Sequence, residues 1–394
     1  MTKIAIISPG TLPVPPVKGG AVENLIQLLY KNNATNSTKK FIIFSIYDEK
    51  AKKIADNFNN KSCEFVFIKN NVLIKALDLF IYKLAKLFRI SKPQSFRFII
   101  SRIMYIRKVA NCLYKNDYDK IVLENHTSLL WTLRLNNNYQ KYAGRYYYHM
   151  HNKINSFYHC ESIFCNSKCV IGVSKYILST LPKSISNSIN CKVLLNRVDE
   201  KIFQKKFSKN QLIKEKEKFH LKGEKIVLFT GRLNKEKGIK QLIEAWRYVK
   251  TNCAVLLIVG GAFFASNVHN PFEKELATLA SSIKGIKFTG FVDYHEIPIL
   301  YAISDLVVLP SVWDDPAPLT VIESITAGKP LITTNSGGIP EYAKGHAIII
   351  KRDKNLILNL SKKIEYALKN PNVRTKVNWK SIDFYYDFMR ILDA

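Results

Sequence analysis

The sequence lacks the features of several common protein classes, and long apolar runs are the first of these. The most apolar stretch, 72–90, contains five charged residues, so we expect no membrane-spanning helix. The N-terminal residues lead straight into a strand-like run rather than a basic and then apolar leader, so we expect no signal peptide. Seven cysteines are an odd number without regular spacing, and free thiols in a reducing cytoplasm are the simplest interpretation.

Acidic residues are also scarce. The 394 residues include 60 Lys and Arg but only 31 Asp and Glu, which gives a formal net charge of +29, and this excess predicts an anionic partner. The segment 69–115 holds eleven basic residues and one acid, Asp78, with apolar residues between them at helical spacing. Two interpretations stay open for this segment: core helices with solvated basic faces, or a face that lies on an anionic membrane. Because we find no helix-turn-helix, zinc-finger or RNP signature, we expect no nucleic-acid partner.

The sequence does contain a regular alternation of strand-like and helical patterns. Such alternation predicts parallel sheets covered on both faces, and two series of it predict an α/β fold with two doubly wound, Rossmann-like domains. The first series of expected strands is 3–8, 40–46, 63–69, 120–124, 145–151, 168–174 and 192–196. The second series is 225–230, 254–259, 286–289, 306–310, 331–333 and 347–350.

The segment 199–223 separates the two series. It is polar, charged and poor in apolar periodicity, as expected of a domain boundary. We therefore predict a first domain over 1–198 and a second over 199–376, in a chain long enough for two sizeable cores. The remaining residues, 377–394, are aromatic and helical in pattern.

Doubly wound sheets bind ligands where their strands end, so the segments that follow two strands of the second series are informative. GRLNKEKG, 231–238, lies between an expected strand and a helix. Its Arg232 and Lys237 suit a diphosphate, because a guanidinium fork and an ammonium group both bind phosphate oxygens. SVWDDPAP, 311–318, also follows a strand and enters a helix expected over 319–327. Either segment alone would also fit a solvated turn.

Two acids eight residues apart accompany that helix. Asp315 lies in the loop, and Glu323 lies one turn inside the helix. An ionised carboxylate only accepts hydrogen bonds, so Glu323 can hold the two hydroxyls of a ribose and Asp315 the hydroxyls of a sugar. The free N–H groups of the helix start would hold phosphates between them. One such acid by itself would be read as a surface residue.

In the first half, SPGTLPVPPVKGGAVE (8–23) joins the first expected strand to a helix that begins near Gly20. Small residues at a helix N-terminus let an anion approach the backbone N–H groups. The segment matches neither a Walker nor a G-x-G-x-x-G motif, and a flexible loop fits it equally well.

Six segments, taken together in this order and spacing, resemble the GT-B glycosyltransferases, specifically glycosyltransferase family 4, over essentially the whole chain. They are KIAIIS from Lys3 with Gly19-Gly20, His151-Asn152, VIGVS ending at Ser174, NRVD from Asn196, GRLNKEKG from Gly231, and Asp315 and Glu323 followed by AGKP from Ala327. The resemblance implies two Rossmann-like domains that face each other across a cleft. It also implies that the C-terminal helix, 377–394, crosses back to the first domain.

The resemblance also implies roles for individual residues of the second domain. Arg232 and Lys237 would hold the donor diphosphate and stabilise the leaving nucleotide. Glu323 would bind the ribose. Asp315 stands where the family usually has Glu, and it would meet the hydroxyls of the donor sugar. Because Asp is one methylene shorter than Glu, the identity of that sugar stays open.

The helix start and the first domain would complete the site. Pro318, Leu319 and Thr320 would help to hold sugar and phosphate, although Pro318 has no N–H to offer, so the contact must come from its neighbours. The family usually has Phe-Gly where this chain has Ala317-Pro318. His151 matches a family histidine near the C6 hydroxyl and the anomeric centre of the donor sugar.

Two glycines and one arginine of the first half carry further implications. Gly19 and Gly20 would line the cleft where acceptor and phosphate meet. Arg197 replaces a common glycine of the family, so the turn must differ here if that position requires a positive φ.

The implied reaction moves a hexosyl unit from a nucleotide sugar with retention at the anomeric carbon, the departing phosphate taking the proton of the acceptor hydroxyl. It needs no metal or other cofactor, because Arg232 and Lys237 neutralise the leaving diphosphate. The expected co-substrate is a UDP-hexose or a UDP-N-acetylhexosamine. We expect a cytoplasmic enzyme, peripheral on the inner face of the membrane through 69–115. Its acceptor would be a glycan or lipid-linked, in the synthesis of a bacterial surface polysaccharide such as capsule or lipopolysaccharide.

Two other functions fit the sequence less well. A nucleotide-sugar 2-epimerase of the same fold would need its own acid pair, which we do not identify in the sequence. A non-catalytic basic protein that binds membrane or nucleic acid would have no use for Arg232, Lys237 and Glu323 together.

Two groups of residues look like metal sites, and we expect neither to bind a metal ion. Asp314-Asp315 could bind a cation as in GT-A transferases, but the two-sheet pattern disagrees and leaves Arg232 and Lys237 without a role. The cysteines between 160 and 169 follow a C-x4-C-x3-C spacing that fits no common zinc site. Strand alternation places His149 and His151 on one face, so one of them could simply be packed.

Overall fold

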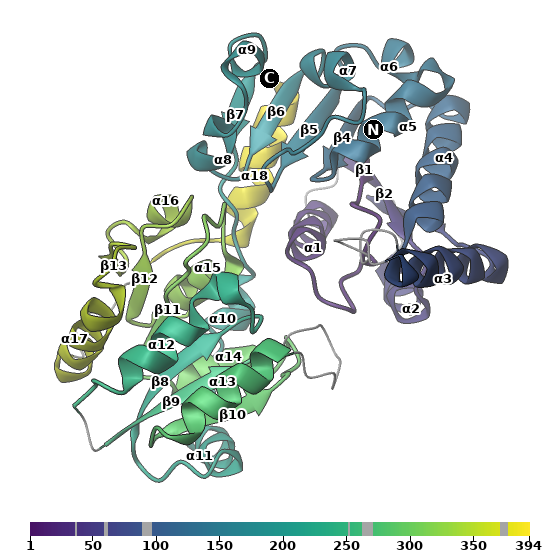
Figure 1. Ribbon diagram of the computed structural model, residues 1–394. Helices are drawn as coiled ribbons and strands as arrows, with labels where there is room; N and C mark the ends of the chain where they lie inside the picture. The colour runs from purple at the N-terminus through teal and green to yellow at the C-terminus, as the bar shows by residue number, and fades with distance from the viewer. Residues whose placement is uncertain (36–37, 59–61, 89–96, 251–252, 262–270, 371–376) are drawn as a thin grey trace. The chain divides into compact units, whose positions relative to one another are not determined.

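The computed structural model describes the whole chain except residues 36–37, 59–61, 89–96, 251–252, 262–270 and 371–376 (Figure 1). The chain divides into two compact units. The first comprises Met1–Val173, Ile177–Leu194 and Tyr385–Ala394, and the second comprises Ser174–Tyr176 and Leu195–Phe384. The domain boundaries that we expected after 198 and 376 stay a prediction.

A parallel sheet with the strand order β3-β2-β1-β4-β5-β6-β7 forms the centre of the first unit. Its central strands are continuous apolar runs with buried side chains, which is the pattern of a sheet covered on both faces. The strands are β1 (Thr2–Ile7), β2 (Lys39–Ile46), β3 (Cys63–Ile68), β4 (Lys120–Glu124), β5 (Tyr146–Met150), β6 (Cys169–Gly172) and β7 (Cys191–Val193).

Helices lie on both faces of this sheet (Figure 1). The longer ones are α1 (Ala21–Ala34), α2 (Glu49–Phe58), α3 (Val72–Leu87) and α4 (Ile99–Lys115). The shorter ones are η2 (Thr127–Leu129), α5 (Leu130–Arg134), η3 (Leu135–Asn137), α6 (Asn138–Lys141), α7 (Glu161–Cys165), α8 (Lys175–Ser179) and α9 (Lys183–Ser186).

The second unit repeats the architecture with the strand order β10-β9-β8-β11-β12-β13, again parallel. Its strands are β8 (Lys225–Thr230), β9 (Ala254–Val259), β10 (Ile286–Gly290), β11 (Leu306–Leu309), β12 (Leu331–Thr334) and β13 (Ile348–Ile350). Its helices are α10 (Glu200–Phe203), α11 (Lys209–Lys218), η4 (Lys235–Lys237), α12 (Ile239–Trp246), α13 (Pro271–Ser281), α14 (Ile297–Ile303), α15 (Leu319–Thr326), α16 (Ile339–Ala343) and α17 (Leu356–Lys369).

In both sheets the strand order reverses beside the first strand, between β1 and β4 and between β8 and β11. This reversal is the switch point at which doubly wound sheets hold ligands. Each expected strand is present, with small differences at its ends, and the predicted pair of doubly wound parallel sheets is confirmed. Among the described residues, no helix combines the length and the apolar character needed to cross a bilayer.

Helix α18 (Ser381–Asp393) begins among the residues of the second unit and ends among those of the first. Its later part is fixed in the first unit by buried apolar side chains and by polar contacts. Phe388 and Leu392 are fully buried, and each such side chain contributes about 1.5–3 kcal/mol. The Tyr385 hydroxyl donates to Asn33 Oδ1 at 2.9 Å, and Asp393 pairs with Lys120 at 2.7 Å.

Candidate functional site

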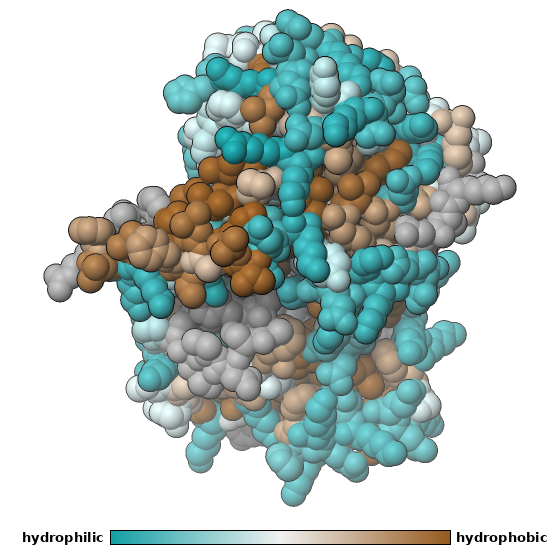
Figure 2. All heavy atoms as spheres, turned by 90° about the vertical axis from the view of Figure 1, so that its right-hand side faces the viewer, coloured by the Kyte–Doolittle hydropathy of each residue, from teal (hydrophilic) through white to brown (hydrophobic). Residues whose placement is uncertain are grey.

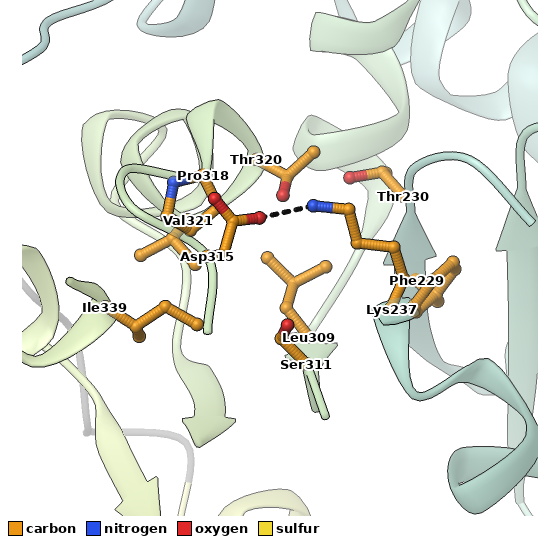
Figure 3. Close-up of a pocket in the computed structure, with 10 residues that line it drawn as sticks. All are labelled: Phe229, Thr230, Lys237, Leu309, Ser311, Asp315, Pro318, Thr320, Val321 and Ile339. Atoms are coloured by element: carbon orange, nitrogen blue, oxygen red, sulfur yellow. Dashed lines mark hydrogen bonds and ion pairs between the residues drawn. The ribbon is translucent and has the colours of Figure 1, made fainter. Parts of the chain in front are cut away.

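A small cavity lies where strands β8 and β11 of the second unit end. Lys237 and Asp315 point toward one another across it, with Lys237 Nζ 2.5 Å from Asp315 Oδ2 (Figure 3). The Lys237 side chain is 21% exposed and that of Asp315 is 9% exposed, so this ion pair is screened less than a surface pair. The residues that line the cavity are Phe229, Thr230, Lys237, Leu309, Ser311, Asp315, Pro318, Thr320, Val321 and Ile339.

The turn after β8 places Lys237 opposite this acid. Asn234 caps the turn by accepting a hydrogen bond from Lys237 N–H, and Gly238 follows with φ 70°. A Cβ at Gly238 would lie 1.9 Å from the carbonyl oxygen of Pro310, so the close approach of the two loops requires glycine. The N–H of Val312 also donates to the carbonyl of Glu236 at 2.9 Å. The loops after β8 and β11 are therefore tied together by their backbones.

A pair of glycines after β12 supports the backbone of Asp315. Gly338 N–H donates to the carbonyl of Asp315 at 2.9 Å, and Gly337 N–H donates to Asp314 Oδ1 at 3.1 Å. A Cβ at Gly338 would meet the carbonyl oxygen of Pro316 at 2.0 Å, and one at Gly337 would meet backbone atoms of Asp314 and Asp315 at 2.6 Å. These glycines were not predicted as part of the site, although a Gly-Gly dipeptide after a strand is a usable signal.

Helix α15 begins at the edge of the cavity, as predicted. Pro318 is its N-cap residue, and the Thr320 side chain lies in the cavity wall (Figure 3). The N–H groups of Leu319 and Thr320 belong to the first turn, where no intrahelical acceptor exists. The structure thus brings Lys237, Asp315 and the start of α15 together.

Glu323 is held away from this cavity wall by two tyrosines. Its side chain is buried, with Oε1 accepting from the Tyr294 hydroxyl at 3.2 Å and Oε2 accepting from the Tyr301 hydroxyl at 3.1 Å. The Tyr301 hydroxyl also lies 3.0 Å from Thr230 Oγ1, at the end of β8. Burial raises the pKa of Glu323 to about 7, although both tyrosine hydroxyls oppose the shift. Sequence reasoning missed the two tyrosines, because nothing in their spacing pointed to Glu323.

Arg232 is not brought into the cavity. It follows Gly231 directly after β8, is exposed, and does not contribute to the cavity wall. Its expected contact with a diphosphate therefore stays a prediction. Arg197, for which the family pattern raised a question, does not adopt a positive φ, and its guanidinium lies 4.7 Å from the ring centre of Trp379. The turn at Arg197 is thus one that a non-glycine residue can adopt.

Gly19 and Gly20, in the first unit, precede helix α1 with φ of 73° and 108°. A Cβ at Gly20 would lie 2.1 Å from Glu23 Oε2, so this carboxylate occupies the space that a side chain would need. Glu23 is buried, and burial raises its pKa to about 7. Both glycines thus adopt positive φ angles, which glycine favours. Their expected part in binding stays a prediction.

His151 lies beside two other buried titratable residues of the first unit. Its Nε2 is 3.0 Å from Glu124 Oε2 at the end of β4, and His149 Nδ1 is 3.0 Å from the same oxygen. All three side chains are at most 8% exposed. Burial favours the neutral acid, but the two histidines outweigh it and lower the pKa of Glu124 to about 2. Among the described residues this trio has the spacing of metal ligands, and the cysteines between 160 and 169 do not join it.

Comparison with known proteins identifies the second unit. Residues 210–382 match the family described as "Glycosyl transferases group 1". The chain carries a glycosyltransferase group 1 domain and is a glycosyltransferase.

The transferase is similar to two Bacillus subtilis (strain 168) proteins. "Spore coat protein SA" is 27% identical over 86% of this chain and 82% of its own length, and "Putative glycosyltransferase YtcC" is 26% identical over 95% and 85%. Its fold matches the solved structure of Anabaena Alr3699/HepE in complex with UDP, at a TM-score of 0.70 with 18% identity and full coverage of both chains. The predicted GT-B fold is thereby confirmed.

Proposed function

We propose that this transferase moves a hexosyl unit from a nucleotide sugar, a UDP-hexose or UDP-N-acetylhexosamine, to a glycan or lipid-linked acceptor. The observation that carries the proposal is the Lys237–Asp315 pair at the ends of β8 and β11, beside the start of α15. An ammonium group and free helix N–H groups suit phosphates, and a carboxylate suits sugar hydroxyls. A UDP complex of a protein with the same fold supports the choice of nucleotide.

Lys237 can serve both partners at once. An ammonium group has three N–H donors, and the contact with Asp315 uses one of them. The remaining donors can meet the oxygens of a diphosphate while Asp315 holds the ammonium group in place. In this proposal Arg232 turns toward the diphosphate when donor binds, and Glu323 accepts the ribose hydroxyls beside its two tyrosines.

The finer parts of the proposal follow the family 4 resemblance. Transfer would retain the configuration at the anomeric carbon, with the departing phosphate accepting the proton of the acceptor hydroxyl. Lys237 and Arg232 would neutralise the leaving diphosphate, which is the task that a metal ion performs in other transferases. The product would be a bacterial surface polysaccharide such as capsule or lipopolysaccharide.

Replacing Arg232 with Ala is expected to weaken UDP binding by about 2–5 kcal/mol, because bound diphosphate desolvates the charge pair. Isothermal titration of UDP and GDP in EDTA measures the effect. Arg247→Ala is the matched control, since this guanidinium belongs to the same unit but contacts Ser282 Oγ instead. Equal UDP affinity in wild type and Arg232→Ala would contradict the role of Arg232. Failure of wild type to bind either nucleotide would contradict the donor proposal itself.

We further propose that the first unit rests on an anionic membrane surface through helix α3. Figure 2 looks at the side on which α3 lies, and it shows a broad hydrophobic area there. On α3 several apolar side chains point into solvent: Val72 is 80% exposed and Leu87 is 74% exposed. Further exposed apolar side chains of the same segment are Leu73, Leu77, Leu79, Phe80 and Phe88.

The polar groups of α3 fit the same interpretation. Its acid, Asp78, is buried and accepts hydrogen bonds from the N–H groups of Ile100 and Ser101 at the start of α4. The lysines Lys75, Lys83 and Lys86 are exposed, and each near an anionic surface contributes about 1 kcal/mol. Exposed apolar side chains among lysines, with the acid turned inward, are the composition of a helix that lies in the bilayer interface.

The double substitution Leu77→Asp with Phe80→Asp is expected to abolish co-sedimentation with vesicles of phosphatidylcholine and phosphatidylglycerol, because it places two like charges at the bilayer. Ile213→Asp on α11 is the control, because Ile213 is 52% exposed but belongs to the second unit. If the double variant sediments as well as wild type at low salt but not at high salt, charge alone holds the protein on the vesicles. No sedimentation of wild type would contradict membrane binding.

A further inference from the structure

The buried trio of Glu124, His149 and His151 is the strongest feature that the proposed transfer leaves unexplained. The family resemblance implies a role for His151 alone. Glu124 is the last residue of β4, and the two histidines flank the end of the neighbouring strand β5 on one face. Their ring centroids are 4.1 Å apart with an interplanar angle of 52°, so the rings pack against each other as well as against the carboxylate.

The hydrogen bond between Glu124 and His151 determines which ring nitrogen carries the proton. His151 Nε2 lies 3.0 Å from Glu124 Oε2 with hydrogen-bond geometry. An ionised carboxylate can only accept, so Nε2 must be the donor. A neutral imidazole has one N–H and one lone pair, and the lone pair of His151 is therefore on Nδ1. No hydrogen bond found among the described residues uses Nδ1 of His151.

His149 packs against His151 but does not compete for the hydrogen bond between His151 and Glu124. His149 Nδ1 is also 3.0 Å from Glu124 Oε2, but neither of its ring nitrogens makes a hydrogen bond of good geometry within the described part of the chain. The interaction of His149 with Glu124 is therefore electrostatic and steric. The ring of His149 limits the rotation of His151, and the carboxylate fixes the proton.

A metal ion fits the same three residues less well. Two imidazoles that ligate one tetrahedral zinc ion keep their ring centroids about 5 Å apart, given Zn–N distances of about 2.0–2.1 Å. The observed 4.1 Å between the His149 and His151 centroids is shorter, while the separations of 3.0 Å from Glu124 Oε2 are ordinary hydrogen-bond lengths.

We propose that Glu124 is a positioning residue: it holds His151 as the Nε2–H tautomer, which leaves Nδ1 as a hydrogen-bond acceptor for the transfer reaction. This role of Nδ1 rests on the proposed transfer reaction, whereas the tautomer assignment rests on the structure of the first unit alone.

Nuclear magnetic resonance of protein labelled with ¹⁵N-histidine tests the assignment without any substrate. In wild type at neutral pH we expect His151, identified by its loss in His151→Asn, to show a protonated Nε2 and an unprotonated Nδ1. Glu124→Leu removes the acceptor at similar volume, so His151 should become a mixture of tautomers. Glu124→Gln keeps an acceptor oxygen without the charge, and it should lie between the two. An unchanged His151 signature in Glu124→Leu would overturn the proposal.

Steady-state kinetics tests the consequence for transfer. Glu124→Leu is expected to lower kcat by about 10²-fold, since misplacement of a positioning group near the reacting centre costs that much, with Glu124→Gln less affected. UDP affinity should stay unchanged in both variants, because the diphosphate site lies in the second unit, and unchanged circular dichroism and urea unfolding would show that the first unit still folds. Asp119→Asn, at the opposite end of β4, is the control for loss of an acid. An unaltered kcat in Glu124→Leu would overturn the role of Nδ1.

Two further outcomes distinguish this proposal from a metal site and from a failure of the proposed function. One equivalent of zinc in purified wild type, lost in Glu124→Gln, would overturn the hydrogen-bonded arrangement in favour of a metal site. Absence of transfer from every donor tested, with the wild-type tautomer as expected, would contradict the proposed function while leaving the Glu124–His151 assignment intact.

Discussion

Lys237→Ala is expected to lower kcat/KM for transfer by about 10²–10³-fold, the usual cost of removing one group that stabilises developing charge. The structure places Lys237 Nζ in the cavity at the end of β8, 2.5 Å from Asp315, so its removal affects both the phosphates and the acid that is expected to meet the sugar. Rates of sugar transfer from UDP-glucose, or from whichever donor is active, measure the loss. Lys235→Ala is the control, because Lys235 is exposed in the same turn.

A double variant distinguishes loss of catalysis from loss of stability. Lys237→Ala alone leaves the buried Asp315 carboxylate without its cation, which costs stability. Adding Asp315→Asn removes that unpaired charge, so the double variant should regain stability in urea unfolding but not activity. Recovery of transfer in the double variant would mean that Lys237 acts only by holding the loop.

Glu323→Gln is expected to change both stability and its pH dependence. Burial raises the pKa of Glu323 from 4.5 to about 7, so between these values the native state keeps a proton that the unfolded state has lost. The contribution of Glu323 to the free energy of unfolding is therefore fully present below about pH 4.5, and it is lost as pH rises through 7. At about pH 8 the ionised, buried carboxylate costs about 3 kcal/mol, and Gln does not carry that cost.

Urea unfolding of wild type and Glu323→Gln at about pH 5 and about pH 8 measures this difference. Glu217→Gln on the exposed face of α11 is the control. In the same pair of proteins, wild-type affinity for UDP-glucose should fall relative to the variant as pH drops below 7, because a protonated carboxyl offers fewer acceptor sites to the ribose. Parallel pH profiles of the two proteins would contradict an ionised Glu323 at the ribose.

Much of the fold could be predicted because its signals are local. Strands such as β9 and β11 are unbroken apolar runs, and the glycines and polar segments between elements mark their ends. Two series of such strands with helices between them leave few alternatives to parallel sheets. The confirmed start of α15 at Leu319 follows from the same kind of signal, since Pro318 suits the position before a first helical turn.

The site was predicted in part, and what was missed depends on distance in the sequence. Lys237 and Asp315 were placed together because both follow strands of one parallel sheet. Tyr294 and Tyr301 reach Glu323 from a segment that carries no motif, and Glu124 reaches His151 from a neighbouring strand. Such contacts depend on strand order and side-chain direction, which residue spacing does not encode.

Helix α3 shows a different limit. The sequence revealed its basic and apolar residues but left open which side would face the core. The structure resolves this through Asp78, whose carboxylate holds the start of α4 and so turns the acid inward. The buried side of α3 is thus the side that carries Asp78 and Ala85, and several of its apolar residues stay exposed.

Helix α18 has a consequence for the order in which the protein is made. Residues 385–394 are synthesised after all of the second unit, yet Phe388 and Leu392 are buried in the first unit, and the carbonyl of Leu392 accepts a hydrogen bond from Tyr147 of β5. The unit whose sheet is synthesised first therefore cannot complete its core until the whole second unit has been made. The half synthesised second has all of its sheet available earlier, so the usual order of domain folding from the N-terminus is reversed at the final step.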